Sequence, residues 1–377
     1  MKFDPNYTIT PRLTKRLLEI ERHREAINIL PITATLIASL RETARLMSTH
    51  YSTQIEGNSL SPNEVQEIAQ GKKGGFPGRE RDEREVRNYF KALEYVEDQL
   101  KKNTKITEKL VQTIHSLVLT GSNRATPYRE AQNVIRDGAT GDIVYMPPEA
   151  EDVAPMMKGL LDWINTEIDK KELPAPILSG LVHYQFATIH PYYDGNGRTA
   201  RLFTTLLLHK MGYDMKGIYS LEEYYAKNLQ GYYKALTIGE SHNYYSGRAK
   251  ADVTPFLDYF LGGMAISFKS VREKAQHLKE LNKDKTIPLQ TEKLRELRPM
   301  QRQILSLFVQ SKEVTAADIA EHLGLKSRSS QTLVKKWLEA DFVKIIDTSR
   351  KSRTYGLTQE WEFLITNKQQ RLSSWKT

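Results

Sequence analysis

Apolar residues recur every three to four positions along most of the chain, a spacing that predicts a mainly α-helical protein. Leu13, Leu17 and Ile20 show this spacing within residues 11–51, where Pro31 interrupts it. The same pattern predicts helices over residues 81–101, 107–120, 150–170, 176–190, 198–212, 221–237 and 253–284.

Residues 121–148 lack the helical period. They contain turn signals, and a β-prone run from Ile143 to Met146 ends at Pro147. This pattern predicts a small β-hairpin over residues 136–148.

The pattern changes again from residue 299 onward. Helical spacing over residues 299–310, 315–325 and 327–340 is followed by β-prone runs over residues 341–347 and 352–358. Three helices followed by a hairpin form the winged-helix plan, with the recognition helix near residues 327–340. The weakened apolar period at residues 282–298 marks the boundary before this unit.

The charge follows the same division. Residues 269–377 contain 22 lysines and arginines against 13 acidic residues, whereas residues 1–268 contain 33 of each. A basic terminal module suggests a polyanion partner such as DNA, and Arg328, Lys335 and Lys336 lie on the predicted recognition helix. Such modules also serve protein contacts and dimerisation, so both interpretations stay open.

The chain contains no cysteine, no run of about 20 apolar residues and no apolar signal segment near its start. We therefore expect a cytoplasmic protein without disulfides, thiolate metal sites or membrane contact.

The densest polar stretch is HPYYDGNGRTAR, residues 190–201. Apolar periods that include Phe186 before it and Phe203 after it predict a helix on each side, the first being amphipathic with one buried face. Gly195 and Gly197 therefore lie in a loop that opens a helix. Backbone N–H groups without intrahelical partners form an anion-binding concavity at such a place.

Two arginines, Arg198 and Arg201, fall in the first turn of the predicted second helix. Cations there oppose the helix dipole, which makes sense if a di- or triphosphate normally fills the site. Asp194 is a hard oxygen ligand suited to Mg²⁺, and His190 is suited to take a proton near neutral pH. These roles together indicate nucleotidyl or phosphoryl transfer to an alcohol or phenol, in preference to a capping turn with incidental charges.

This stretch resembles the signature of the Fic family, His-x-Phe/Tyr-x-Asp/Glu-Gly-Asn-Gly-Arg-x-x-Arg, with Tyr192 at the usual Phe position. The resemblance implies a protein adenylyltransferase that moves AMP from ATP to a Tyr, Thr or Ser hydroxyl of a target protein or of itself. It implies His190 as general base and Asp194 as the Mg²⁺ ligand. Gly197, in place of the bulkier cation of Doc-like phosphotransferases, favours adenylyl transfer. The implied phosphate-binding set is Gly195, Asn196, Gly197, Arg198 and Arg201.

A second stretch, STQIEGN, resembles the family's inhibitory motif through Ser52, Glu56 and Gly57. The resemblance implies an N-terminal inhibitory helix at about residues 35–57, whose Glu56 pairs with Arg201 in place of the γ-phosphate. A plain helix end with Gly57 in the left-handed conformation is the alternative, and the two can both hold.

Two further features follow from the resemblance alone. The hairpin at residues 136–148 is similar to the family's flap, which holds a target peptide by strand addition, and Val144 and Tyr145 are expected at its tip. Residues 220–236 correspond to the region that forms the adenine pocket. The candidates in that region are Asn228, Tyr232 and Tyr233.

The predicted architecture is an all-helical Fic core with a small hairpin flap and a C-terminal winged-helix (α+β) domain. Its parts are an N-terminal helical region over residues 1–105, a catalytic core over residues 106–285 and the winged helix over residues 286–377. The expected partners are a target protein and, through the winged helix, DNA or another protein, and a homodimer is compatible with the sequence. Two other functions stay open: removal of AMP at the same site, and a DNA-binding regulator that senses nucleotide.

Overall fold

The computed structural model of the 377-residue chain divides into two compact units, residues 1–278 and residues 279–377. The structure describes residues 1–30, 32, 34–71, 75–102, 104–136, 138, 140–239, 241–283, 296–311, 313–347, 349 and 353–362. Pro31 and most of the predicted boundary at residues 282–298 lie outside these ranges.

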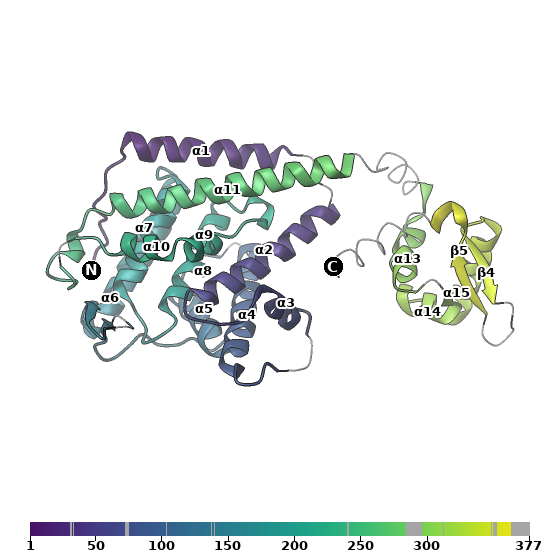
Figure 1. The fold of residues 1–377 in the computed structure, drawn as a ribbon, viewed down its shortest axis with the longest axis horizontal. Helices are drawn as coiled ribbons and strands as arrows, with labels where there is room; N and C mark the ends of the chain where they lie inside the picture. The colour runs from purple at the N-terminus through teal and green to yellow at the C-terminus, as the bar shows by residue number, and fades with distance from the viewer. Residues whose placement is uncertain are drawn as a thin grey trace. The chain divides into compact units, whose positions relative to one another are not determined.

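The first unit consists of helices and one short antiparallel hairpin (Figure 1). Its elements in chain order are α1 (Pro11–Asn28), α2 (Ala34–Gln54), α3 (Pro62–Ala69), α4 (Glu80–Lys102), α5 (Glu108–Thr120), β1 (Ile135–Arg136), β2 (Ile143–Tyr145), α6 (Ala150–Lys170), α7 (Ala175–Ile189), α8 (Asn196–Lys210), the 3₁₀ turn η1 (Met215–Gly217), α9 (Glu222–Lys227), α10 (Leu229–Leu236), the 3₁₀ turn η2 (Arg248–Lys250) and α11 (Thr254–Lys283).

Two helical segments differ from the sequence prediction. The single helix expected over residues 221–237 is broken into α9 and α10, because Asn228 has non-helical backbone angles (φ −129°, ψ 48°). Helix α3 was not predicted at all. Its signal is a capping box, in which the Ser61 side chain accepts a hydrogen bond from the Glu64 amide and the Glu64 side chain accepts one from the Ser61 amide. Too few apolar positions follow to establish a helical period.

Helix α7 is the centre of the first unit. Its residues Val182 and Phe186 belong to an apolar cluster with α4, α5, α6 and α8, whereas Leu181 and Tyr184 belong to a second cluster with α1, the 215–232 segment and α11. The expectation of one buried face is therefore wrong. Both sides of α7 are buried because helices pack around it on all sides, and this holds the chain end at residue 190 in place.

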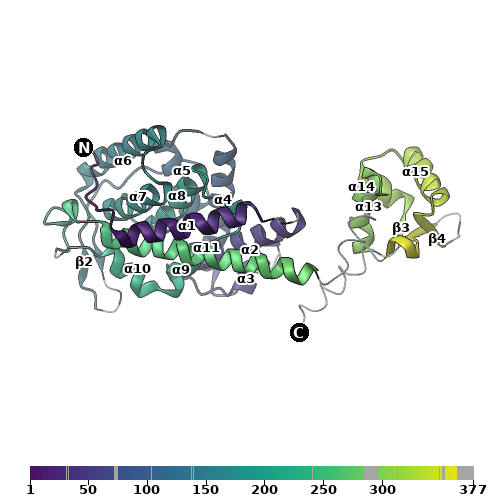
Figure 2. The same cartoon turned by 90° about the horizontal axis from the view of Figure 1, so that it is seen from above.

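Helices α1 and α11 lie side by side along the outside of the second cluster (Figures 1 and 2). Leu13, Ile20 and Ile27 of α1 point into that cluster with the phenylalanines of α11. None of the helices in the described part of the chain combines the length and hydrophobicity that crossing a bilayer requires.

The second unit has its own apolar core, which includes Ile304, Phe308 and Trp337. Its elements are α13 (Pro299–Gln310), β3 (Val314–Thr315), α14 (Ala316–Leu323), α15 (Ser327–Glu339), β4 (Val343–Asp347) and β5 (Thr354–Leu357). The strands form an antiparallel sheet in the order β3-β5-β4. Three helices and two of these strands lie where the sequence predicted them, β3 was not predicted, and the winged-helix assignment stays a prediction.

A glycine lets α7 and α11 approach closely. A Cβ built on Gly180 would lie 2.8 Å from Leu257 Cδ2 and 3.0 Å from Phe260 Cδ1. We expect Gly180→Ala to lower the melting temperature by about 2–6 °C, because overpacking by about 1–3 kcal/mol exceeds the gain in helix propensity. Gly262→Ala is the control, since its Cβ would meet only ordinary contacts with Arg16 at 3.6 Å. Equal melting temperatures for the two variants would contradict the close-approach argument.

Candidate active site

The candidate site begins where α7 ends. His190 is the C-cap of α7 and adopts a left-handed conformation (φ 50°), which costs a non-glycine residue about 1–3 kcal/mol. Its carbonyl accepts a hydrogen bond from Arg129 Nε at 3.0 Å, and the buried Arg129 guanidinium also donates to the Ala131 and Pro148 carbonyls. Arg129 thereby ties the backbone of His190 to the hairpin segment.

The turn between His190 and α8 exposes amide groups. Gly195 is the N-cap of α8 with φ +77°, and its amide donates to Asp194 Oδ1 at 2.6 Å. The first bond of the helix ladder runs from the Thr199 amide to the Gly195 carbonyl. The amides of residues 196–198 precede that bond and have no intrahelical acceptor, so they form the positive end of the α8 dipole.

The loop itself is rigidly braced. Asn196 is buried, and its side chain binds both the amide and the carbonyl of Tyr192, at 3.0 and 2.8 Å. The Tyr192 ring stacks on His115, whose Nε2 lies 2.9 Å from the Asp194 carbonyl oxygen. The Asn196 side chain therefore shapes the loop, and only its backbone is available to an anion.

Arg198 is buried beside the turn. Its guanidinium lies 3.6 Å from Glu85 Oε1 and 3.5 Å from Asp194 Oδ1. Its Nε has no hydrogen-bond partner among the residues that the structure describes. Arg198 is thus an incompletely satisfied cation at a helix N-terminus.

Arg201 lies in the second turn of α8, not in the first as the sequence suggested, because the helix already begins at Asn196. Its side chain is only 1 % exposed, and it donates to the Ser52 hydroxyl at 2.9 Å and to the Ser52 carbonyl at 2.8 Å. Its Nη2 lies 2.9 Å from Glu56 Oε1. Burial alone would lower the pKa of Arg201, but the Glu56 carboxylate and nearby phenol oxygens outweigh burial and raise it.

Glu56 is placed by the way α2 ends. The Gly57 amide donates to the Gln54 carbonyl and the Asn58 amide to the Thr53 carbonyl, and Gly57 has φ +90°. This is a Schellman motif, with Glu56 as the helix cap. The plain helix end and the ion pair with Arg201 are both present, as the sequence allowed.

The Glu56 carboxylate lies at the phosphate position that the sequence predicted. A Cβ built on Gly197 would collide with Glu56 Oε1, so this oxygen sits against the bare backbone at the start of α8. The turn therefore does hold an anion in this conformation, and the anion is a side chain of the same protein.

The candidate histidines differ in their surroundings. Burial lowers the pKa of His190 to about 4, so its ring is neutral at pH 7. His183 is fully buried between the Thr204 and Tyr232 hydroxyls, and burial lowers its pKa to about 3. His183 therefore has a structural role, whereas His190, taken as a whole residue, is only partly buried.

The two aromatic adenine candidates have different surroundings. Tyr232 is only 3 % exposed and stacks on Tyr225 in the core, so it offers no surface to a nucleotide here. Tyr233 is 48 % exposed, and its hydroxyl donates to the Ile55 carbonyl beside Glu56. Asn228 marks the break between α9 and α10. Asn228 and Tyr233 thus remain the adenine candidates.

The hairpin prediction is also corrected in part. Val144 is exposed, but Tyr145 is buried and its hydroxyl donates to the Thr188 carbonyl of α7 at 2.7 Å. Side chains alternate across a strand, so Val144 and Tyr145 point to opposite faces. Tyr145 anchors the hairpin to α7, whereas Val144 and its neighbour Ile143 are exposed.

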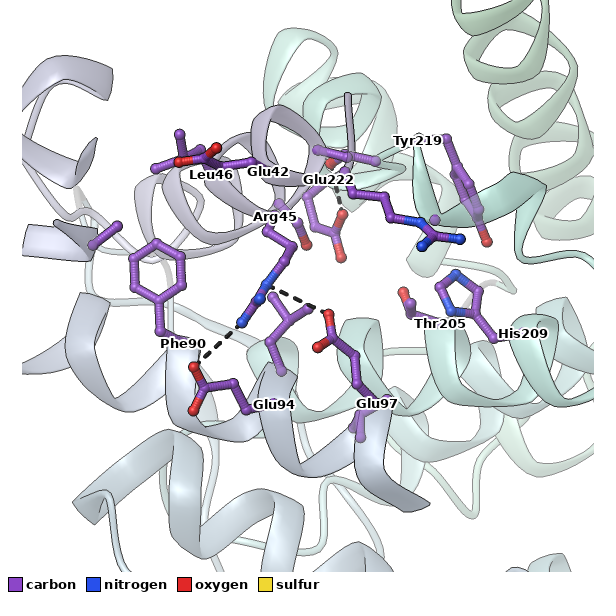
Figure 3. A pocket seen from close by; sticks show the side chains of 18 of the residues that line it. Glu42, Arg45, Leu46, Phe90, Glu94, Glu97, Thr205, His209, Tyr219 and Glu222 are labelled. Carbon is purple, nitrogen blue, oxygen red and sulfur yellow. Dashed lines mark hydrogen bonds and ion pairs between the residues drawn. The ribbon is translucent and has the colours of Figure 1, made fainter. Parts of the chain in front are cut away.

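A cavity of about 1010 Å³ opens beside α2, between α4, α8 and residues 214–222 (Figure 3). Arg45 of α2 reaches across it to Glu94 and Glu97 of α4, both at 3.4 Å. Residues 190–201 do not line this cavity. The cavity is therefore separate from the candidate site, and the ion pairs across it hold α2 against α4.

No group of three or more metal-binding side chains gathers within the described ranges. Asp194 is 62 % exposed, and one carboxylate oxygen is engaged by Gly195. A single exposed carboxylate suits Mg²⁺ that is bound mainly by water and substrate phosphates, so this donor set fits the ion implied by the sequence.

Residues 105–208, which contain α5 to most of α8, match the model of the Fic/DOC family. They form a Fic domain. The fold of the chain agrees, since the crystal structure of a Fic family protein from Desulfovibrio desulfuricans G20 matches it with a TM-score of 0.57 at 24 % identity. That match covers 95 % of this chain and 99 % of the other.

Relatives of the Fic domain carry a function in their names. The protein adenylyltransferase Fic of Drosophila willistoni is 27 % identical over 200 residues, which are 53 % of this chain and 39 % of that protein. The protein of the same name from Nematostella vectensis is 29 % identical over 208 residues, 54 % of this chain and 46 % of that protein. This chain matches less than half the length of these relatives.

Sequence reasoning missed the groups that brace the Fic domain's loop. Arg129 and Glu85 carry no local motif, because their partners are backbone carbonyls and side chains far away in the sequence. Asn58, directly after Gly57, was passed over, although its side chain is buried. The available sequence signal was an asparagine directly after a helix-ending glycine.

The buried histidines predict acid sensitivity. Their folded-state pKa values, about 3 for His183 and about 4 for His115, His190 and His209, lie below the ordinary 6.5 of the unfolded chain. The unfolded state therefore binds more protons below pH 6.5, and the free energy of unfolding should fall as the pH drops from 6.5 toward 4. We expect the decrease in melting temperature between pH 7 and pH 5 to be smaller in His183→Gln than in the unaltered protein. Equal decreases would contradict a buried neutral His183.

Proposed function

We propose that the chain is a protein adenylyltransferase whose nucleotide site is blocked by its own Glu56. The observation that carries this proposal is the position of the Glu56 carboxylate, which lies against Gly197 and 2.9 Å from the buried Arg201. An intramolecular carboxylate at a helix N-terminus marks a place built for an anion. The names of the relatives support AMP as the transferred group.

In the proposed reaction, the α8 N-terminus and the two arginines bind the triphosphate of ATP. The target's hydroxyl oxygen forms a bond to the α-phosphorus, the bond from that phosphorus to the β-phosphate bridging oxygen breaks, and pyrophosphate leaves. His190 accepts the hydroxyl proton, since its neutral ring is available as a base at pH 7. Asp194 would hold Mg²⁺, which neutralises phosphate charge when bound.

The proposed inhibition is a competition for Arg201. As long as Glu56 pairs with it, the guanidinium is unavailable to the γ-phosphate, and the carboxylate repels phosphate from the adjoining amides. Glu56 has a side chain that is 28 % exposed, so it can leave toward solvent without unfolding the core. A partner protein with an accessible hydroxyl and Val144 at the hairpin complete the proposed arrangement.

Two substitutions test this mechanism with ATP labelled on its α-phosphate. Glu56→Gly should raise label transfer to the chain itself or to a partner by roughly 5–150-fold, the range of a coupling of about 1–3 kcal/mol. Replacing the base, His190→Ala, should lower the rate by about 10²–10⁴-fold. Glu42→Gln, an exposed acid on the same helix α2, is the matched control and should behave like the unaltered protein.

Equal label transfer by all of these variants would reject the mechanism. Loss of bound label that is faster in the unaltered protein than in Glu56→Gly would instead assign AMP removal, with Glu56 orienting a water.

A second activity, DNA binding, is favoured by the surface of α15. Lys326, Arg328, Lys335 and Lys336 are all exposed along this helix, whose only acid is Glu339 at its far end. Exposed Gln331 and Thr332 lie between these cations. A helix with this polarity suits phosphate contacts in a groove of DNA.

Salt dependence tests this second activity. Binding of the full chain to labelled duplex DNA should weaken as salt rises, and replacing both Lys335 and Lys336 with alanine should reduce the slope of log K against log salt by about 2. Lys158→Ala, an exposed cation on α6, should leave the slope unchanged. Absence of binding at low salt would assign the second unit to protein contacts.

A further inference from the structure

The turn that carries Glu56 is fastened to α4 by residues that do not touch Arg201. The Asn58 side chain is buried and donates from Nδ2 to the Asp82 carbonyl at 3.0 Å and to Glu85 Oε2 at 3.2 Å. Its Oδ1 accepts from the Leu60 amide at 3.1 Å. Ser59 adds two hydrogen bonds to the Asp82 carboxylate. The inhibitory turn is therefore latched to the first turns of α4.

The Glu85 carboxylate, which accepts the hydrogen bond from Asn58, also lies beside Arg198. Glu85 Oε1 lies 3.6 Å from Arg198 Nη1 and 3.1 Å from Arg81 Nε. The Glu85 side chain is 11 % exposed and that of Arg198 is 3 % exposed, so water screens their interaction weakly. One buried carboxylate thus contacts a predicted phosphate ligand through one oxygen and the inhibitory turn through the other.

We propose that Glu85 is a positioning residue that orients Arg198 for phosphate and, through Asn58, holds Glu56 in its blocking position. The inference rests on the proposed function and adds the residue that couples the blocked state of the site to its nucleotide-bound state. A phosphate that draws Arg198 toward the α8 N-terminus weakens the ion pair between Arg198 and Glu85. When the turn after Glu56 moves away from α4, Asn58 releases the other oxygen of the same carboxylate.

The ion pairs that join α2 to α4 through Arg45 do not share this geometry. Arg45 reaches Glu94 and Glu97 in the cavity shown in Figure 3, but Glu94 is 65 % exposed and Glu97 is 38 % exposed. Pairs as exposed as these contribute little. They fasten the two helices without touching either the turn after Glu56 or the start of α8.

The two halves of the proposal are separated by three variants of the full chain. Asn58→Ala removes the latch only, Glu85→Gln weakens the latch and removes the charge beside Arg198, and Glu94→Gln is the control on the same helix. Hydrogen exchange of the Gly57, Asn58 and Leu60 amides reports the turn without requiring any activity. We expect exchange at these amides to speed up by about fivefold or more in the first two variants, and to stay unchanged in the control.

Affinity for ATP with Mg²⁺ reports whether Arg198 is oriented for phosphate. It is measured by calorimetry in the background Glu56→Gly with His190→Ala, where neither inhibition nor turnover interferes. Adding Glu85→Gln should raise the Kd by about tenfold, because Arg198 loses its charged partner, whereas adding Asn58→Ala should change it by less than about twofold. With Glu56 intact, Asn58→Ala should lower the Kd, since the blocking carboxylate is released.

The inference is overturned if Glu85→Gln leaves both the exchange rates and the Kd unchanged, or if Asn58→Ala and Glu85→Gln shift the Kd equally in the Glu56→Gly background. Melting curves exclude global unfolding as the cause, and Asn58→Ala tests the latch even if Glu85→Gln unfolds. Absence of ATP binding in every variant would reject the proposed function instead, and unchanged exchange rates would still overturn the latch.

Discussion

The rest of the site depends on the burial of one guanidinium. Arg201 projects from α8 into the interior with its side chain 1 % exposed, and a cation in that position requires acceptors and a counter-charge. The end of α2 and the turn that follows it supply three such groups, the Ser52 hydroxyl, the Ser52 carbonyl and the Glu56 carboxylate. Because these groups belong to one turn, satisfying Arg201 also fixes where α2 ends. Arg198, nearer the start of α8, is less completely satisfied, because its buried Nε has no hydrogen-bond partner among the described residues.

A second constraint holds the C-terminal end of α7. His190 adopts a left-handed backbone conformation that its own chemistry does not favour, and it persists because Arg129 grips its carbonyl while α7 is buried on both sides. The hairpin takes part in this arrangement through the Tyr145 hydroxyl and the Pro148 carbonyl. His190, the turn before α8 and the hairpin are therefore positioned by one continuous set of contacts.

Local patterns predicted the elements, and long-range contacts decided the details. The apolar period located α7 and α8, and the glycines located the turn between them, because both signals are read within a few residues. The period gave no sign that α7 is buried all round, since Leu181 and Val182 face different neighbours. The aromatic run at residues 224–233 looked uniform, yet consecutive positions of α10 face different sides, so that Tyr232 lies in the core and Tyr233 outside. Asn58, Glu85 and Arg129 escaped prediction because each acts on a segment that only the fold brings near.

Because α2 ends in a Schellman motif, the direction of the Glu56 side chain depends on the exact number of residues in that helix. Each residue advances the side-chain direction by about 100°, so an insertion or deletion of one residue before Gly57 would swing the terminal carboxylate to another side of the cylinder. A change of about a full turn would restore the angle and shift the carboxylate by about 5.4 Å along the axis. The phase of this single helix end, counted from the residues that pack α2 onto its neighbours, thus determines whether the Glu56 carboxylate reaches Arg201 and the start of α8.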